Sequence, residues 1–243
     1  LYLGADVETV ITPLGESFLH TNDYEAVYSL GKTHRLSQKA RLEWELLKAS
    51  ANIRQGRMSE ALNNYQTAIR TAPKNTKVLN AFATFHIRIG EIDKAKALVD
   101  LSKGFDADNF RTWHLQGQIY KHRKKIDLAV SAFEKALSIN PDDTISKRAL
   151  ARIHLDRGEN EKALLMVDQV LTAAPNDPQA QLIKARLLLL ANNSSLARQT
   201  LNELNQRLGL ATEDYVLDNN WINYIKGISA YLLQNYESAV RHL

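Results

Sequence analysis

The stretch of sequence that decides the fold runs from Phe110 to Asp143: FRTWHLQGQIYKHRKKIDLAVSAFEKALSINPDD. It is 34 residues long, and the same interval separates a series of small residues along the chain. These residues are Gly15, Ala49, Ala83, Gly117, Ala151 and Ala185. Small residues that recur at one fixed interval indicate a single structural element copied several times.

A second small residue follows the first after 12 residues. It is found at Ala61, Ala95, Ala129, Ala163, Ala197 and, after Gly227, at Ala239. Two helices cross closely only where the side chains at the crossing are short. The pattern therefore predicts pairs of antiparallel helices, with larger residues such as Phe82 and Leu150 filling the rest of the core.

Turn residues indicate where the helices end. The place seven residues after the first small position should close the first helix of a pair with a left-handed turn, which glycine adopts without strain. It holds Gly56, Gly90, Lys124, Gly158 and Asn192. A proline such as Pro141 then ends the second helix, since proline cannot continue it.

The register defines the expected repeats. They are 42–75, 76–109, 110–143, 144–177 and 178–211, with a degenerate copy at 8–41 and a partial copy at 220–243. Because Gly227 follows Ala185 by 42 residues, an insertion is expected near 208–219. We expect residues 1–243 to form one array. Both ends stop inside a repeat, so we also expect a fragment of a longer array whose apolar end faces can self-associate.

The composition and the absence of known motifs argue against several classes of function. The chain has 31 basic and 27 acidic residues and a net charge of +4, a weak excess that argues against a nucleic-acid partner. The absence of cysteine excludes disulfides, thiol catalysis and cysteine-based zinc sites. We find no HExxH motif, no glycine-rich phosphate loop and no Ser/His/Asp set, so we expect no enzyme activity, no cofactor and no metal.

The histidines have a structural interpretation. His86 and His154 stand at the place that Tyr120 occupies in its own repeat, so they are expected to pack between helices. His114 and His122 lie two turns apart on one helix face, too far to share a metal ion without a third ligand.

The copy at 110–143 resembles the tetratricopeptide repeat superfamily. The resemblance rests on Trp113, Gly117, Tyr120, Ala129, Phe133, Ala136 and Pro141, and it extends over residues 42–209. It implies an all-α, right-handed superhelical solenoid of antiparallel helix pairs. Such a protein is expected to be a non-catalytic scaffold that binds protein partners.

Three segments also resemble a narrower bacterial family, the long repeat lipoproteins found with PEP-CTERM and exosortase systems and with exopolysaccharide clusters. They are LGADVETV at 3–10 with GESFL at 15–19, APNDPQA at 174–180, and the closing stretch 227–243. This resemblance implies a protein of the bacterial cell envelope, facing the periplasm and held at the membrane only by a lipid anchor outside this chain. Its expected role is envelope assembly linked to exopolysaccharide or surface-protein export. A cytoplasmic adaptor or an RNA-associated helical-repeat protein is the alternative.

The tetratricopeptide resemblance also implies a binding groove. In that superfamily the first helix of each pair lines a concave face, with the second, fifth, ninth and twelfth places of a repeat pointing into it. Together with neighbouring positions this gives Lys77, Asn80, Arg88, Arg111, His114, Gln118, Lys121, Arg148, Arg152, Arg186, Trp221 and Tyr224.

The middle of this predicted groove is basic. Arginine binds carboxylates well because its planar group donates two parallel hydrogen bonds, so an acidic peptide is the expected partner. The pair Trp221 and Tyr224 favours direct binding of an anionic polysaccharide as an alternative. The competing interpretation is a solvated helix face whose arginines pair with neighbouring acids.

Overall fold

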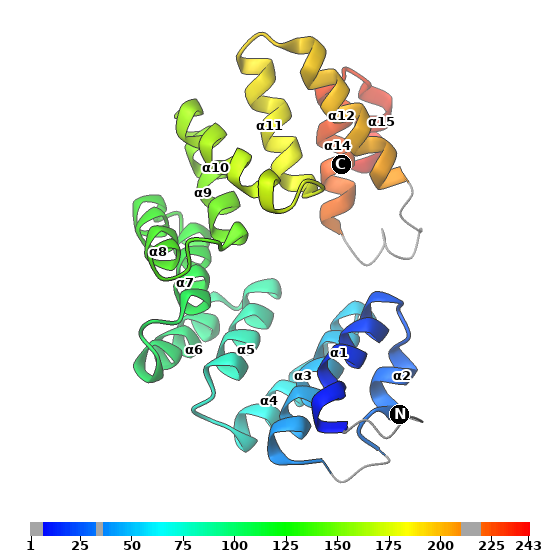
Figure 1. The fold of residues 1–243 in the computed structure, drawn as a ribbon, viewed down its shortest axis with the longest axis vertical. Helices are drawn as coiled ribbons and strands as arrows, with labels where there is room; N and C mark the ends of the chain where they lie inside the picture. The colour runs from blue at the N-terminus through cyan, green and yellow to red at the C-terminus, as the bar shows by residue number, and fades with distance from the viewer. Residues whose placement is uncertain (1–6, 33–35, 210–219) are drawn as a thin grey trace. The chain divides into compact units, whose positions relative to one another are not determined.

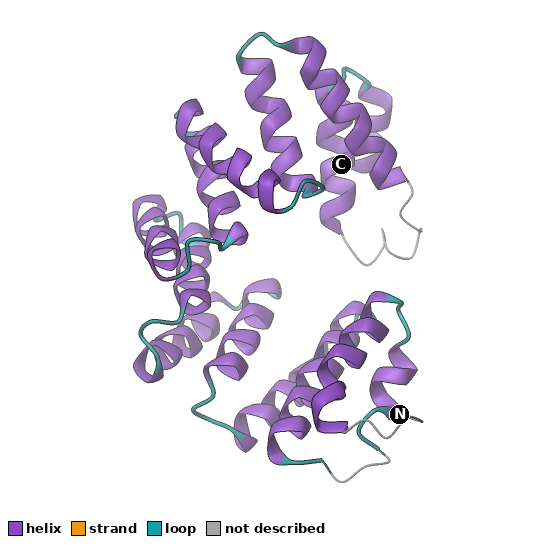
Figure 2. Cartoon of the chain, viewed as in Figure 1, coloured by secondary structure: helices purple, strands orange, loops and turns teal. Residues whose placement is uncertain are grey.

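The computed structural model describes residues 7–32, 36–209 and 220–243, except for the side chains of residues 7, 8, 220 and 221. Over these ranges the chain consists of α-helices and loops, with no strand (Figure 2). The prediction of an all-α fold of helix pairs is confirmed. The chain divides into two compact units, Leu1–Leu115 and Gln116–Leu243.

Figure 1 shows the helices in chain order. The first unit contains α1 (Val7–His20), α2 (Tyr24–Ser29), α3 (Gln38–Arg54), α4 (Met58–Thr71), α5 (Thr76–Arg88) and α6 (Ile92–Phe105). Helix α7 (Phe110–His122) crosses the boundary. The second unit continues with α8 (Ile126–Ile139), α9 (Thr144–Asp156), α10 (Asn160–Ala173), α11 (Pro178–Leu190), α12 (Ser194–Gly209), α14 (Asn220–Leu232) and α15 (Tyr236–His242).

Consecutive helices pack as pairs within each unit. In the first unit α3 packs on α4 and α5 on α6, and in the second α9 packs on α10 and α11 on α12. Helices α5, α7, α9 and α11 begin at Thr76, Phe110, Thr144 and Pro178, so their starts lie 34 residues apart. The insertion predicted near 208–219 lies outside the described residues, except for residues 208 and 209 at the end of α12.

The small residues lie where the helices of a pair cross. Nine of them have no exposed surface: Ala49, Ala61, Ala83, Ala95, Ala129, Ala151, Ala163, Ala185 and Ala197. At Gly117 the neighbouring helix is closer still, because a Cβ atom there would lie 2.6 Å from Cε1 of Phe133. The Phe133 ring is itself fully buried, so it has no room to move aside.

The predicted turn chemistry is also confirmed. All five residues at the end of a first helix have positive φ, including Lys124 at 58° and Asn192 at 58°. The next helix pair begins with a side-chain cap in four successive repeats, where Asn75, Asn109, Asp143 and Asp177 each accept a hydrogen bond from the backbone N–H three residues on.

His86 and His154 pack between helices, as expected. His86 is 4% exposed, and its ring centroid lies 4.4 Å from that of Phe82. Nδ1 of His86 lies 2.6 Å from Glu91, and Nδ1 of His154 lies 3.0 Å from Glu159. Each of these glutamates is the N-cap residue of the following helix, so the same contact ties the first helix of a pair to the second in both compact units.

Within the described ranges, none of the helices combines the length and the apolarity that a lipid bilayer requires of a spanning segment.

The close crossing at Gly117 can be tested by filling it. We expect Gly117→Val to lower the free energy of unfolding by about 1–3 kcal/mol, because the added methyl groups must displace the Phe133 ring. Gly104→Ala is the matched control, since Gly104 lies inside α6 with no atom near its missing Cβ. That change should leave stability equal or raise it by up to about 1 kcal/mol. Urea unfolding followed by circular dichroism measures both, and equal midpoints for Gly117→Val and the parent chain would disprove the close crossing.

The buried histidine predicts acid sensitivity. Burial lowers the pKa of His86 below its ordinary value of 6.5, against the opposing effect of Glu91. The unfolded chain therefore binds a proton at a higher pH than the folded chain. As the pH falls through about 6.5, protonation of the unfolded chain lowers the free energy of unfolding. The unfolding free energy should drop between pH 7 and pH 5 by at most about 1.4 kcal/mol per unit from this group. In His86→Gln, which keeps a hydrogen-bonding side chain, the profile should be flatter; an unchanged slope would rule out His86 as the cause.

Candidate functional site

Four of the predicted groove residues come together in the second compact unit. Lys121 lies on α7, Arg152 on α9, Arg186 on α11 and Tyr224 on α14. Each of these helices is the first of its pair, as the superfamily resemblance implied. We call these four residues and Asp156 of α9 the cationic cluster.

Asp156 and Tyr224 hold the arginines of the cluster in place. Nε of Arg152 lies 3.4 Å from Oδ2 of Asp156, and Nη1 of Arg186 lies 3.8 Å from Oδ1 of the same carboxylate. Tyr224 also interacts with Arg152 and favours its charged form. Burial disfavours the charged guanidinium, yet the contacts with Tyr224 and Asp156 raise the pKa of Arg152 above its ordinary value. One carboxylate thus faces two guanidinium groups, so positive charge remains.

A pocket of about 440 Å³ lies in this cluster, between Lys121, Ile126, Arg152, Ile153, Asp156 and Arg157. Desolvation lowers the pKa of the Lys121 ammonium, and the charge of Arg152 acts in the same direction while Asp156 opposes both. Arg157 is paired with Asp127 at 2.5 Å. The pocket therefore holds two cations, Lys121 and Arg152, that repel each other. A bound anion would offset this repulsion.

Arg148 has a different role in the structure. Its guanidinium forms an ion pair with Asp177, and both side chains are largely covered. Asp177 also accepts the backbone N–H of Ala180 at 2.8 Å, which caps α11. Arg148 thus connects α9 to the start of α11.

Two of the predicted residues in the first unit are engaged in contacts between repeats. Nζ of Lys77 lies 2.6 Å from Glu43. Asn80 is 6% exposed, and its amide exchanges two hydrogen bonds with the Thr112 hydroxyl, at 2.8 and 3.1 Å. The Thr112 hydroxyl is in turn 3.0 Å from that of Ser102. Both side chains thus join one repeat to its neighbour.

The remaining predicted residues are dispersed. Arg88 and Arg111 are exposed, with the Arg111 guanidinium 5.3 Å from the Phe110 ring centroid. His114 is buried and Gln118 is half-buried. The side chain of Trp221 lies outside the described part of the chain, so the predicted aromatic pair is represented by Tyr224, whose side chain is 45% exposed. No group of three or more histidine and carboxylate side chains with the spacing of a metal site occurs among the described residues.

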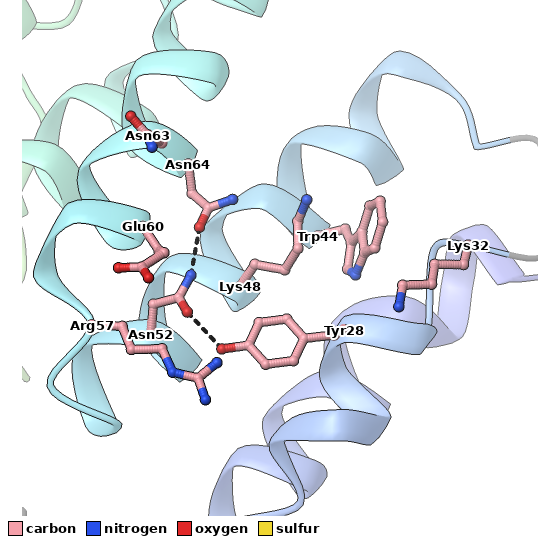
Figure 3. Close-up of a pocket in the computed structure, with 9 residues that line it drawn as sticks. All are labelled: Tyr28, Lys32, Trp44, Lys48, Asn52, Arg57, Glu60, Asn63 and Asn64. Carbon is pink, nitrogen blue, oxygen red and sulfur yellow. Dashed lines mark hydrogen bonds between the residues drawn. The ribbon is translucent and has the colours of Figure 1, made fainter.

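The first unit contains a polar network that we did not predict. The Tyr28 hydroxyl donates to Oδ1 of Asn52 at 2.6 Å, and Nδ2 of Asn52 donates to Oδ1 of Asn64 at 2.8 Å (Figure 3). Nδ2 of Asn64 then donates to Glu45 at 2.7 Å, and the Lys48 ammonium donates to the other oxygen of Glu45 at 2.8 Å. The residues come from α2, α3 and α4.

The 34-residue register contains the signal that would have revealed this network. Glu45, Lys48 and Asn52 occupy places that are mostly apolar or aromatic in the next two repeats. Those repeats hold Leu79, Phe82 and His86, then Trp113, Gln116 and Tyr120. Glu45 is 8% exposed and Asn52 is 5% exposed, so both are buried, as are Leu79 and His86, their counterparts in the next repeat.

A pocket of about 460 Å³ opens beside the network, as Figure 3 shows. It is lined by Tyr28, Lys32, Trp44, Lys48, Asn52, Arg57, Glu60, Asn63 and Asn64. The Trp44 indole N–H donates to the carbonyl of Val27 at 2.8 Å, and the Lys48 ammonium sits 3.9 Å from the Trp44 ring centroid. The ring is thereby fixed in the wall of the pocket.

Part of the chain is similar in sequence to a known protein. One curated relative, the cellulose synthase operon protein C of Xanthomonas axonopodis pv. citri (strain 306), is 33% identical over 101 residues. The match covers 42% of this chain and 7% of that protein.

Two solved structures illustrate the fold. PilW, described as a widely conserved type IV pilus biogenesis factor, is 18% identical with a TM-score of 0.62, over 83% of this chain and 90% of PilW. The APC/C hetero-tetramer Cut9–Hcn1 is 12% identical with a TM-score of 0.69, over 93% of this chain and 42% of the other. At these identities the likeness concerns the fold alone.

The family model of the tetratricopeptide repeat matches residues 52–119 and 122–187. These two stretches cover more than half of the chain, and they coincide with the paired helices and buried small residues described above. The chain belongs to the tetratricopeptide repeat family, and its fold is an all-α solenoid of helix pairs.

Proposed function

We propose that this protein is a non-catalytic scaffold that binds an acidic segment of a protein partner on the cationic cluster of its second compact unit. The observation that supports this most directly is the convergence of Lys121, Arg152 and Arg186 from three successive first helices, with Asp156 as the carboxylate between them. A carboxylate from a partner would lie between groups that now repel one another.

The chemistry of the cluster favours a flexible acidic peptide. Arg152 and Arg186 are partly exposed, with 43% and 36% of their side chains accessible, so a ligand can reach them. Their guanidinium groups are already oriented by Asp156, which reduces the entropy that binding would cost. The Tyr224 hydroxyl beside Arg152 adds a polar group that can bond to a peptide backbone.

The proposed setting is the bacterial cell envelope. The curated relative bears the name of a cellulose synthase operon protein, and PilW that of a type IV pilus biogenesis factor. The first name concerns cellulose synthesis and the second the assembly of a pilus. Together with the resemblance to the PEP-CTERM-associated lipoproteins, they support a role in exopolysaccharide or surface-protein export, with the full-length protein held by a lipid anchor. Fractionation of cells producing the full-length protein tests this, and recovery in the cytoplasm would favour the adaptor alternative.

The acidic-peptide proposal predicts a specific loss on removing two charges. In Arg152→Gln/Arg186→Gln we expect affinity for a hexaglutamate peptide to fall at least about tenfold, because two charge-assisted hydrogen bonds are lost. Binding to the parent chain should also weaken as salt rises from low to physiological concentration. Isothermal titration calorimetry measures both effects.

The matched control is Arg198→Gln/Arg207→Gln, which removes the same charge from α12, the second helix of its pair. This control should bind the peptide with the parent affinity. If both double variants weaken binding equally, the attraction is a general effect of net charge and the assignment to the cationic cluster is wrong.

A further inference from the structure

We infer that the pocket of the first compact unit, shown in Figure 3, is a binding site for a uronic acid, a sugar that bears a carboxylate. The site lies in a different compact unit from the cationic cluster, so it does not depend on the function proposed for that cluster.

The first argument is the energetic cost of the polar network. A buried carboxylate such as Glu45 is strongly disfavoured unless it is paired and hydrogen-bonded, and even a paired one rarely stabilises a fold more than apolar packing does. The neighbouring repeats show that Leu79 and Phe82 fill the equivalent places of Glu45 and Lys48. A polar set at positions where the same fold accepts apolar residues indicates a site rather than a packing requirement.

The second argument is the orientation of the network. Its hydrogen bonds run in one direction, from Gln55 to Tyr28 at 2.9 Å, then through Asn52 and Asn64 to Glu45. Each asparagine uses one N–H in this chain and has a second, and the Lys48 ammonium has two N–H groups beyond the one given to Glu45. The network therefore holds amide and ammonium donors in fixed positions at the pocket wall.

The third argument distinguishes a sugar from an acidic peptide. The exposed rim contributes Lys32 and Arg57 as cations, Asn63 as an amide that both donates and accepts, and Glu60 as an acceptor. The hydroxyl groups of a sugar donate and accept at once, so they satisfy Asn63 and Glu60 together, whereas the side-chain carboxylates of an acidic peptide have no donor to offer Glu60.

The size of the pocket agrees with this ligand class. The pocket volume of about 460 Å³ lies within the range of roughly 300–1,000 Å³ typical of small-molecule sites. The Tyr28 ring offers apolar surface for the carbon face of a sugar ring, while Lys48 and Arg57 are the cations of the lining that can pair with its carboxylate.

The experiment is a titration of the whole chain with trigalacturonate, followed by calorimetry, with neutral maltotriose and hexaglutamate as comparison ligands. We expect trigalacturonate to bind and maltotriose to bind at least about tenfold more weakly, because it lacks the carboxylate. Arg57→Gln and Asn63→Ala should each weaken trigalacturonate binding by about fivefold to tenfold. Both side chains are exposed, so these variants should fold normally.

Arg70→Gln is the charge-matched control for Arg57→Gln. Arg70 lies at the other end of α4, away from the residues that line the pocket, and it bonds only to Thr67 among the contacts that the structure describes. Its variant should bind trigalacturonate as the parent chain does. The inference is overturned if the parent chain does not bind trigalacturonate, or if Arg57→Gln and Asn63→Ala bind it unchanged. If hexaglutamate binds as tightly as trigalacturonate, and Arg57→Gln and Asn63→Ala lose this binding too, the pocket is instead a site for acidic peptides.

A second variant tests why the network is there. The triple substitution Glu45→Leu/Lys48→Phe/Asn52→His gives this repeat the residues of the next one. We expect it to lose trigalacturonate binding while its urea midpoint stays close to that of the parent chain, since Leu and Phe restore apolar packing and the half-buried Tyr28 and Asn64 can bond to water instead. Undiminished binding of trigalacturonate by this variant would contradict the inference.

Discussion

The fold depends on how closely the two helices of each pair can approach. Where the helices cross, the chain places residues with no side chain beyond Cβ, and at Gly117 even a Cβ atom would overlap the Phe133 ring. This approach lets larger residues on either side interlock, so that Phe133, Leu150 and Ile119 are excluded from water. Because the crossing recurs at a constant interval, each helix pair presents the next with a surface of the same kind.

The same geometry determines where function can reside. Side chains near the crossings are committed to packing, and those at the ends of helices are committed to caps and turns. The variable places are those that face outward from the first helices, where Lys121, Arg152 and Arg186 gather, and the few core places where apolar residues have been replaced. Glu45 belongs to the second kind, since it is buried at a position that the next repeat fills with Leu79.

The helix bounds, turns and caps followed closely from the sequence, because each depends on a local rule. A left-handed turn was predicted at Lys124 from register alone and is present at φ 58°, although lysine is poorly suited to it. The candidate sites were harder to predict. Asn80 and Arg148 have the right spacing for a groove, but Asn80 bonds to Thr112 and Arg148 to Asp177, partners 32 and 29 residues away. Spacing along a helix predicts the face on which a side chain lies. It does not predict which residue of another repeat that side chain contacts.

By itself the sequence determined the repeat, the helix pairs and the class of residue at each crossing. These features are periodic, and periodicity is visible along one chain. Only the tertiary structure decided which charges remain available and which are paired, because ion pairs such as Arg186 with Asp156 form between repeats. It also decided that Tyr28, Asn52 and Asn64 share one pocket, since a pocket is made by three helices whose packing distances no linear pattern contains.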